Sequence, residues 1–393
     1  MPQNNKEVYL DHAATTYTDE EVLKAMLPYF TDIFANPESL HTAGKKAQIA
    51  IDNSRETIAH ILHCQSSEIV FTSGGTESNN LAILGLTKTF KAAHPTKKHH
   101  CITSKIEHPS VLETFKQLEK EGWKVTYLDV DSEGFINLDE LKSALTADTA
   151  LVSIIYANNE IGTIQNILEI GKICRTAKVP FHTDACQAAG ALDLNVQNLH
   201  VDMMTINSSK IYGPKGVGAL YVKQGVSISP IIYGGHQEND IRPGTHNVPG
   251  IIGLGKALEI AHKNSETENA RLIKLRDHFI NQLLSKIPDS ILNGSPDRRL
   301  PNNINISIKG VNGQQLLLLL DEQKIYVSTG SACHAGSNIG SHVLGAIKLH
   351  PNLIRGSLRL TLGKRTTQED IDYALEKIIT TVAKIRIHQF QKV

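Results

Sequence analysis

The chain lacks long apolar runs, a net charge and a pairable set of cysteines. No stretch of its 393 residues approaches the ~18 consecutive apolar residues of a membrane span. Forty basic residues balance 40 acidic ones, which argues against nucleic-acid binding driven by a strongly basic surface. The five cysteines are an odd number without CxxC spacing, so we expect a reducing compartment and no disulfide framework.

Two further absences narrow the class of protein. The first residues, Met1 to Lys6, contain no apolar segment of the kind found in secretory signals, so we expect a cytoplasmic protein. The 18 histidines do not fall at metal-ligand spacing on any one element, and no metal site is expected. What remains is ordinary globular usage, with 40% hydrophobic and 20% charged residues in a chain long enough for two domains.

Short apolar runs alternate with longer helical segments between residues 66 and 225. Strands are expected at residues 68–72, 100–103, 150–156, 180–183 and 203–206. Helices are expected to begin near Thr76 and at Pro109, since proline is favoured in a first turn. The run at 150–156 is continuously apolar, as in a strand buried on both faces. This alternation predicts an α/β domain with a mostly parallel sheet.

The C-terminal third follows a different pattern. A charged helix at 254–286 would lead out of the first domain, and residues 303–308 and 356–362 alternate with period 2. Further helices are expected at 314–321 and 367–386. We therefore predict a large domain over residues 15–260 and a smaller α+β domain formed by residues 1–14 and 261–393.

Lys210 stands in a turn with the sequence Asn-Ser-Ser-Lys-Ile-Tyr-Gly-Pro, directly after the apolar run 203–206. Its glycine and proline fix the backbone. Asp184 ends another apolar strand, and a buried carboxylate is costly unless it is paired. An amine that can form a Schiff base, together with an acid that can hold a pyridinium nitrogen, is what a pyridoxal phosphate site needs. This cofactor would restrict the substrate to a compound with an amino group.

Other polar residues also follow strands, where a ligand crevice forms in open α/β sheets. Gly75 and Thr76 open a helix whose N–H groups could hold a phosphate, although an ordinary strand–helix turn has the same sequence pattern. His108 could stack on a flat ring or simply cap a helix. Asn158 could reach a phenolic oxygen or simply form a turn.

Cys333 lies in a stretch of small residues and glycines at 327–337, unlike a core segment. A thiol on such a loop is a candidate nucleophile, whereas the other four cysteines are interpreted as buried apolar residues. Arg359 lies on an alternating strand. It would be a surface charge by default, but in a pocket its guanidinium would pair with a carboxylate.

Together these motifs resemble the group I cysteine desulfurases of iron–sulfur cluster assembly, which are fold type I, class V aminotransferase-like pyridoxal phosphate enzymes. The resemblance runs from Tyr9–Thr16 to Leu362–Arg365 and covers nearly the whole chain. It implies a large domain with a mostly parallel central sheet and a smaller α+β domain that carries the cysteine loop. It also implies an L-cysteine substrate, a homodimer and a protein sulfur acceptor, such as an iron–sulfur scaffold or a thiolation carrier.

The resemblance assigns roles to individual residues. Lys210 would form the Schiff base and move the substrate Cα proton, Cys333 would accept the sulfur as a persulfide, and His108 would stack on the ring and assist as an acid–base. The implied cofactor contacts are Gly75, Thr76, His108, Asn158, Asp184, Gln187, Ser209, Lys210 and, from the partner subunit, Thr245. The implied substrate contacts are Asn36, Asn158 and Arg359.

Three positions depart from the family pattern. Ser209 stands where a histidine is usual, Asn207 where a phosphate-binding serine is frequent, and His334 where a threonine is common. Two alternatives therefore stay open. One is another pyridoxal enzyme of the same fold, such as a selenocysteine lyase or an aminotransferase. The other is a catalytically degenerate structural partner.

Overall fold

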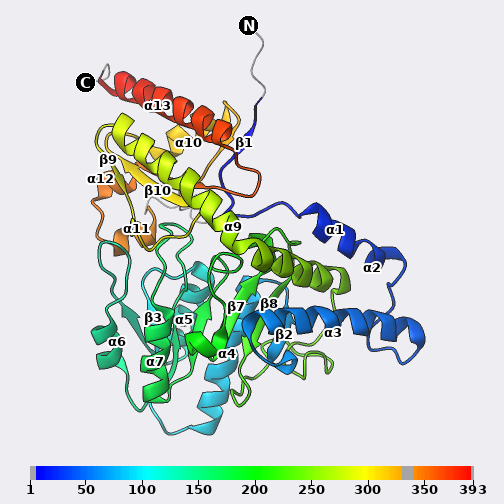
Figure 1. Ribbon diagram of the computed structural model, residues 1–393. Coiled ribbons are helices and arrows are strands. Elements are labelled where there is room, and N and C mark those ends of the chain that lie inside the picture. Colours follow the sequence, from blue (N-terminus) through cyan, green and yellow to red (C-terminus); the bar gives the residue numbers. More distant parts are fainter. Residues whose placement is uncertain (1–5, 330–339, 391–393) are drawn as a thin grey trace.

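The computed structural model describes residues 6–329 and 340–390 (Figure 1). Its largest element is a seven-stranded sheet with the strand order β2-β8-β7-β6-β5-β3-β4. The strands are β2 (Ile69–Thr72), β3 (His100–Ser104), β4 (Lys124–Leu128), β5 (Thr149–Ser153), β6 (Phe181–Asp184), β7 (Met203–Asn207) and β8 (Gly218–Val222). Within this sheet β8 is antiparallel to both of its neighbours, and the remaining pairs are parallel. The predicted α/β fold with a mostly parallel sheet is confirmed.

Both faces of this sheet are covered, which explains why its strands are continuously apolar. Neighbouring residues belong to different hydrophobic clusters: Val70 and Leu151 pack on one face, while Phe71 and Val152 pack on the other. The covering helices include α4 (Gly75–Ala93), α5 (Pro109–Lys120), α6 (Leu138–Ala144), α7 (Ile167–Ala177) and α8 (Val196–Leu199). A strand buried on both faces loses the period-2 pattern, as expected.

The predicted elements differ from the observed ones mainly at their ends. Regular β5 pairing ends at Ser153, although the N–H groups of Ile154 and Tyr156 still donate to carbonyls of β6. Strands β4 and β8 were not predicted. The first is a partly exposed edge strand, and the second begins at a glycine behind a Gly-Pro turn.

Helix α9 (Val248–Lys286) is 39 residues long and runs from the large sheet to the C-terminal unit (Figure 1). Its first half packs against α1 (Glu20–Met26), α2 (Pro28–Thr31) and α3 (Thr42–Leu62). It begins six residues before the predicted start at 254. The glycines in its first turns permit close packing against neighbouring elements. A Cβ on Gly253 would lie 2.7 Å from the sulfur of Met26 and equally close to Pro214.

The C-terminal unit is a three-stranded antiparallel sheet covered by helices. Its order is β12-β10-β9, from β12 (Ser357–Thr361), β10 (Asn303–Ile308) and β9 (Ser290–Leu292). Helices α10 (Gly313–Asp321) and α13 (Gln368–Phe390) pack with it, and α11 (His342–Ala346) and α12 (Pro351–Ile354) precede β12. The N-terminal strand β1 (Val8–Tyr9) joins this unit by pairing in parallel with β11 (Ile325–Tyr326).

The alternating residues of β10 are buried on both faces. Asn303 and Asn305 donate to the backbone oxygen of Glu160, at 3.1 Å each, so the polar face of this strand meets the larger unit. Helix α11 packs through Val343 and Leu344 into the core of the seven-stranded sheet, although it belongs to the predicted small domain. The division at residues 14 and 260 stays a prediction.

Over the described residues, no helix combines the length and apolarity needed to cross a membrane. In the same part of the chain, no group of three or more His, Cys, Asp or Glu side chains is arranged to hold a metal ion.

Candidate active site

A cavity of about 300 Å³ lies at the carboxyl ends of β3, β5, β6 and β7. This is where ligands bind in open α/β sheets. Predicted site residues that line it are Gly75, Thr76, His108, Asp184, Gln187, Lys210 and Arg359. The fold thus brings together residues spread over almost 300 positions of the sequence.

Lys210 is held by a short 3₁₀ turn, η2 (Ser208–Lys210), directly after β7. The side chain of Asn207 accepts from the N–H of Ser209 at 3.4 Å and starts the turn. Gly213 closes it, because a Cβ there would lie 2.0 Å from the hydroxyl of Ser208. The sequence Asn-Ser-Ser-Lys-Ile-Tyr-Gly therefore fixes the position of one amine.

The Lys210 amine donates to the carbonyl of Ala13, at 2.8 Å, and to that of Ala14. Burial lowers the pKa of Lys210, and the positive charge of Arg359 acts in the same direction. A lowered pKa increases the neutral fraction of an amine, which is the form that acts as nucleophile or base.

Asp184 is buried at the end of β6. One carboxylate oxygen accepts from the side-chain amide of Asn79 at 2.7 Å, and the other from the N–H of Cys186 at 2.9 Å. The carbonyl oxygen of the Asn79 amide is itself buried without a partner among the described residues. Both donors orient the carboxylate at the cavity wall, where a cationic ring nitrogen would complete it.

His108 caps a helix and also lines the cavity, while its predicted stacking on a cofactor ring stays a prediction. Its Nδ1 accepts from the N–H of Ser110 at 3.1 Å and caps α5, while the ring lines the cavity. Burial lowers the pKa of His108, so its neutral form is favoured. The preceding residue, Glu107, is fully buried, and burial raises its pKa to about 8.

The N-terminus of α4 is the part of the cavity suited to a phosphate. Within residues 6–329 and 340–390, no side chain caps this 19-residue helix, and Gly75 and Thr76 in its first turn line the cavity. A Cβ on Gly75 would lie 2.7 Å from the sulfur of Cys186, and one on Gly218 would lie 2.8 Å from Gly74. Glycines are needed at these positions because Cys186, after β6, and the first residue of β8 lie directly against the turn. The N–H groups of the first helical turn favour an anion.

Arg359 lies on β12 and is buried, which excludes the surface alternative for it. Its Nη2 donates to Asp11 at 2.8 Å and its Nη1 to the carbonyl of Asn159 at 3.1 Å. Its Nε is buried without a partner among the described residues. These two bonds use two of the five guanidinium N–H groups, and the others of this cavity-lining residue are left for an anionic group.

Other predicted site residues lie at the edge of the cavity or away from it. Gln187 lines it and donates to the Ala13 carbonyl at 3.0 Å. Asn158 is buried beside it: its amide donates to the Ile106 carbonyl, and its oxygen accepts from Glu160 and Ile161. The neighbouring Asn159 lines the cavity instead. The predicted role of Asn158 stays a prediction.

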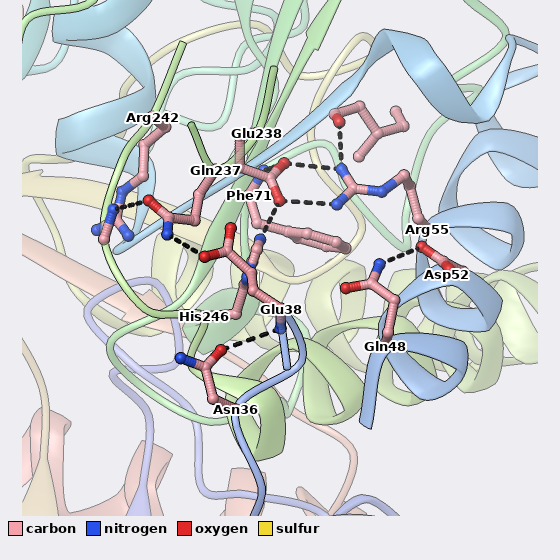
Figure 2. Close-up of polar contacts among 12 residues, drawn as sticks. Asn36, Glu38, Gln48, Asp52, Arg55, Phe71, Gln237, Glu238, Arg242 and His246 are labelled. Atoms are coloured by element: carbon pink, nitrogen blue, oxygen red, sulfur yellow. Dashed lines mark hydrogen bonds and ion pairs between the residues drawn. The ribbon is translucent and has the colours of Figure 1, made fainter. Parts of the chain in front are cut away.

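Three further predicted residues are not brought to this cavity within one chain. Asn36 and Thr245 are exposed, and Figure 2 shows Asn36 hydrogen-bonded to the backbone of Glu38 in a separate polar cluster. Ser209 follows Asn207 in the Lys210 turn, and its carbonyl accepts from Thr16. Cys333 lies outside the described residues.

Several functional candidates were missed by sequence reasoning. Asn79 lies three positions after Thr76, a helical spacing that places both at one end of α4, and this signal was available. Glu160 lines the cavity next to Arg359, and its burial, which raises its pKa to about 7, depends on β10 far along the chain. His342 also lines the cavity, and no motif marked it.

A larger cavity of about 400 Å³ lies on the other side of Lys210 and Gln187. Its wall includes Ala189, Ile260 and Leu272 but neither Asp184 nor Arg359. We therefore assign the chemistry to the smaller cavity. There, an amine, an oriented carboxylate, an uncapped helix N-terminus and an unpaired guanidinium N–H match the ring, phosphate and substrate groups expected in a pyridoxal phosphate site.

Comparison with known proteins agrees with this arrangement. Residues 8–374 match the family described as Aminotransferase class-V. The chain is 50% identical to the cysteine desulfurase IscS of Clostridium botulinum over 374 residues, covering 95% of this chain and 93% of that protein. It is also 50% identical to IscS of Dictyoglomus turgidum over 381 residues, covering 97% and 96%. A solved NifS-like protein is 36% identical, with a TM-score of 0.90 over 96% of this chain and 100% of that one.

Proposed function

Because the chain belongs to the aminotransferase class-V family, we infer that it is a pyridoxal-phosphate-dependent cysteine desulfurase. It takes the sulfur from L-cysteine and leaves L-alanine. The observation that carries this inference is one cavity lined by Lys210, Asp184 and Arg359, in a chain half identical to named cysteine desulfurases over nearly its whole length.

Pyridoxal phosphate, when bound, supplies an electron sink next to the substrate Cα. Lys210 would carry it, Asp184 would hold its ring nitrogen, and His108 would stack on the ring. The N-terminus of α4, with Gly75 and Thr76, would hold the phosphate together with Ser209 and the partner's Thr245. Gln187 and Asn158 would face the phenolic oxygen.

The residues of this chain would divide the remaining work. The remaining N–H groups of Arg359 would bind the substrate carboxylate, joined by the partner's Asn36, and would fix the Cα next to the Lys210 amine. Lys210, with its lowered pKa, would remove the Cα proton. The burial of Arg359 strengthens this carboxylate contact by excluding water.

Cys333 would be the sulfur acceptor, on the support of its small-residue sequence and the family resemblance. Its thiolate would attack the sulfur of the bound cysteine, so that an S–S bond forms as the substrate C–S bond breaks. The Cys333 persulfide is then one product, and L-alanine is the other after the carbon is protonated.

We further propose that the enzyme works as a cytoplasmic homodimer. Asn36 and Thr245 are both exposed, and their segments are joined by the hydrogen bond from the Gln237 amide to Glu38 (Figure 2), which suits residues that serve a partner subunit. The sulfur would pass to an acceptor protein, such as an iron–sulfur scaffold or a thiolation carrier.

Product analysis tests this function. With L-cysteine and a thiol reductant, the cofactor-loaded protein should form equal amounts of alanine and sulfide. Lys210→Ala should lower alanine formation by at least ~10²–10⁴-fold, the range typical of a lost acid–base residue. Cys333→Ala should abolish persulfide-dependent sulfide release, whereas Cys64→Ala, which lies outside the cavity, should have no effect.

The alternatives give different products. A keto acid in place of alanine would identify an aminotransferase, and turnover of selenocysteine without turnover of cysteine would identify a selenocysteine lyase. Either result would overturn the desulfurase.

A further inference from the structure

The loop over residues 236–247 holds Thr245 by both of its neighbours. Thr245 itself is exposed. The N–H of Gly244 donates to the side-chain oxygen of Gln237 at 2.8 Å, and His246 Nε2 lies 2.8 Å from a carboxylate oxygen of Glu238 (Figure 2). Gln237 and Glu238 thus hold the residues on the two sides of Thr245, and Thr245 itself faces outward.

Glu238 is in turn anchored to the large unit. Both terminal nitrogens of the Arg55 guanidinium, Nη1 and Nη2, donate to the Glu238 carboxylate at 2.7 Å. The N–H of Phe71 donates to the same carboxylate at 2.9 Å. Arg55 comes from α3 and stacks over the Phe71 ring with 4.6 Å to the centroid. Phe71 lies on β2, which leads into residues 73–77 at the start of α4, the phosphate turn that would hold the cofactor phosphate. The Glu238 side chain is nearly fully buried, so these bonds are shielded from water.

The backbone of this loop is strained where Glu238 holds it. Glu238, Asn239 and Asp240 have φ values of 51°, 55° and 65°. This is a left-handed backbone conformation that residues other than glycine adopt at a cost in free energy. Such strain persists only where the surroundings over-determine the structure. The four hydrogen-bonding contacts of Glu238 do so here, and they indicate a loop built to keep one shape.

The same loop also touches the phosphate turn of its own chain. Arg242 donates through Nε to Glu77 at 2.8 Å, and Glu77 accepts from the N–H of Ser73 at 2.7 Å. Glu77 directly follows Thr76 in the first turn of α4. One rigid segment therefore contacts the phosphate turn of its own subunit and presents Thr245 outward.

We propose that Gln237 and Glu238 are positioning residues that hold Thr245 for the cofactor phosphate of the partner subunit. The loop thereby ties the phosphate site of one subunit to that of the other. This inference rests on the proposed function, in which Thr245 acts across a homodimer. The buried cluster of Arg55, Glu238 and His246 would therefore support the active site of the partner subunit.

Cofactor affinity in homodimers gives the first test. Glu238→Gln keeps the size of the side chain but removes the charge that Arg55 and His246 share. It should raise the dissociation constant of pyridoxal phosphate about 10–100-fold, as expected for one lost hydrogen bond to a charged group. At saturating cofactor the KM for cysteine should be unchanged. Thr245→Val should have the same effect, and the double variant should be no worse than either single variant.

A matched control is Glu68→Gln. Glu68 is also buried and accepts from the N–H groups of Gln65 and Gln224, but it has no contact with the loop. It should leave cofactor affinity unchanged. The proposal fails if Glu238→Gln weakens cofactor binding while Thr245→Val does not, or if the two effects multiply.

Heterodimers purified through two different tags separate an effect on the partner from an effect within one chain. In the first, a Lys210→Ala subunit is paired with a Glu238→Gln subunit, so the site with a lysine receives an intact Thr245 loop. In the second, a Lys210→Ala/Glu238→Gln subunit is paired with a wild-type subunit, so that site receives a defective loop. The readout is the visible absorbance of lysine-bound cofactor during titration, which occurs only in the subunit that has Lys210.

We expect wild-type affinity in the first heterodimer and weakened affinity in the second. The reverse order would mean that Glu238 acts on its own subunit, and equal affinities would mean a purely structural residue; both results overturn the proposal. Absence of alanine formation by the wild-type protein would instead overturn the function, because cofactor binding is measured without turnover.

Discussion

Two buried glutamates show how neighbouring residues set a charge. At Glu107 burial raises the pKa to about 8, since only the Ser104 hydroxyl and one backbone N–H oppose it. At Glu238 burial acts in the same direction, but hydrogen bonds from Arg55 and His246 outweigh it and hold the pKa at about 2. The difference lies in the partners, because both carboxyls are removed from water.

A pH-dependent stability difference should follow from Glu107. Its pKa is raised above the ordinary value of 4.5, so its contribution to stability is fully present below pH 4.5 and is lost as pH rises towards 8. Glu107→Gln should therefore match the wild type near pH 4.5 and be more stable at pH 7, by an amount on the order of 3 kcal/mol. Urea unfolding of the cofactor-free protein at pH 4.5, 6 and 8 measures this.

The exposed Glu56 on α3 provides the control. Glu56→Gln should show no gap that widens with pH. A Glu107→Gln difference that stays constant from pH 4.5 to 8 would contradict the assigned protonation.

At the scale of single residues, the sequence was enough to predict which polar side chains lie at the ends of strands and line the cavity. Lys210, Asp184 and His108 could be predicted because a strand end in an α/β sheet points to the ligand crevice. Glu160 could not, since its burial depends on Asn303 and Asn305, more than 140 positions away. The role of Asn158 stays a prediction, although it is the neighbouring Asn159 that lines the cavity.

At the scale of elements, the N-terminus of α4 depends on the absence of a side chain. Gly75→Ala would place a methyl group 2.7 Å from the Cys186 sulfur, and overpacking of this kind costs about 1–3 kcal/mol. We expect reduced unfolding free energy and weaker cofactor binding. Adding Cys186→Ala should restore part of both, because it removes the atom that the methyl group meets.

Gly345→Ala is the matched control. Gly345 lies in α11, and a Cβ there would meet no atom of the described part of the chain within 4 Å. It should be neutral or slightly stabilising, as alanine is favoured over glycine in helices. If Cys186→Ala gave no rescue of Gly75→Ala, the contact would not be the cause of the loss.

Elements were predictable where burial on both faces or helical periodicity dominated. The strands with continuous apolar runs were identified for the first reason, and α10 and α13 for the second. Strand β4 was missed because an edge strand such as Lys-Val-Thr-Tyr-Leu keeps polar residues. The start of α9 was missed because glycines such as Gly253 and Gly255 resemble a loop in sequence. In space, Gly253 allows close packing against Met26 of α1 and Gly255 against Ser54 of α3.

At the scale of the whole molecule, the N-terminal segment joins the two units. The N–H of Val8 donates to the carbonyl of Lys324 at 2.9 Å, and that of Leu10 to the carbonyl of Tyr326 at 2.8 Å. Thr361 then accepts from the N–H of Ala13 at 2.9 Å. The Ala13 and Ala14 carbonyls that hold Lys210 are therefore placed by the C-terminal unit.

Val8→Pro tests this link. It removes the N–H that pairs with Lys324, which should cost about 1–3 kcal/mol more than Val8→Ala, a variant that loses similar packing but keeps the N–H. Because Ala13 and Ala14 would shift, alanine formation from cysteine should also be slower than in Val8→Ala, by about 10-fold or more. Equal kcat values in the two variants would show that the segment does not align Lys210.

The pairing of β1 with β11 also sets an order of assembly during synthesis. Residues 69–222 contain all seven strands of the large sheet and Lys210, so these can associate once that part has left the ribosome. The Ala13–Ala14 wall cannot be placed until residues 325–361 have followed, and Arg359 is among the last of them. A growing chain thus has its reactive amine long before the cavity around it is complete. The ability to process cysteine is therefore acquired only after residues 325–361 have been synthesised.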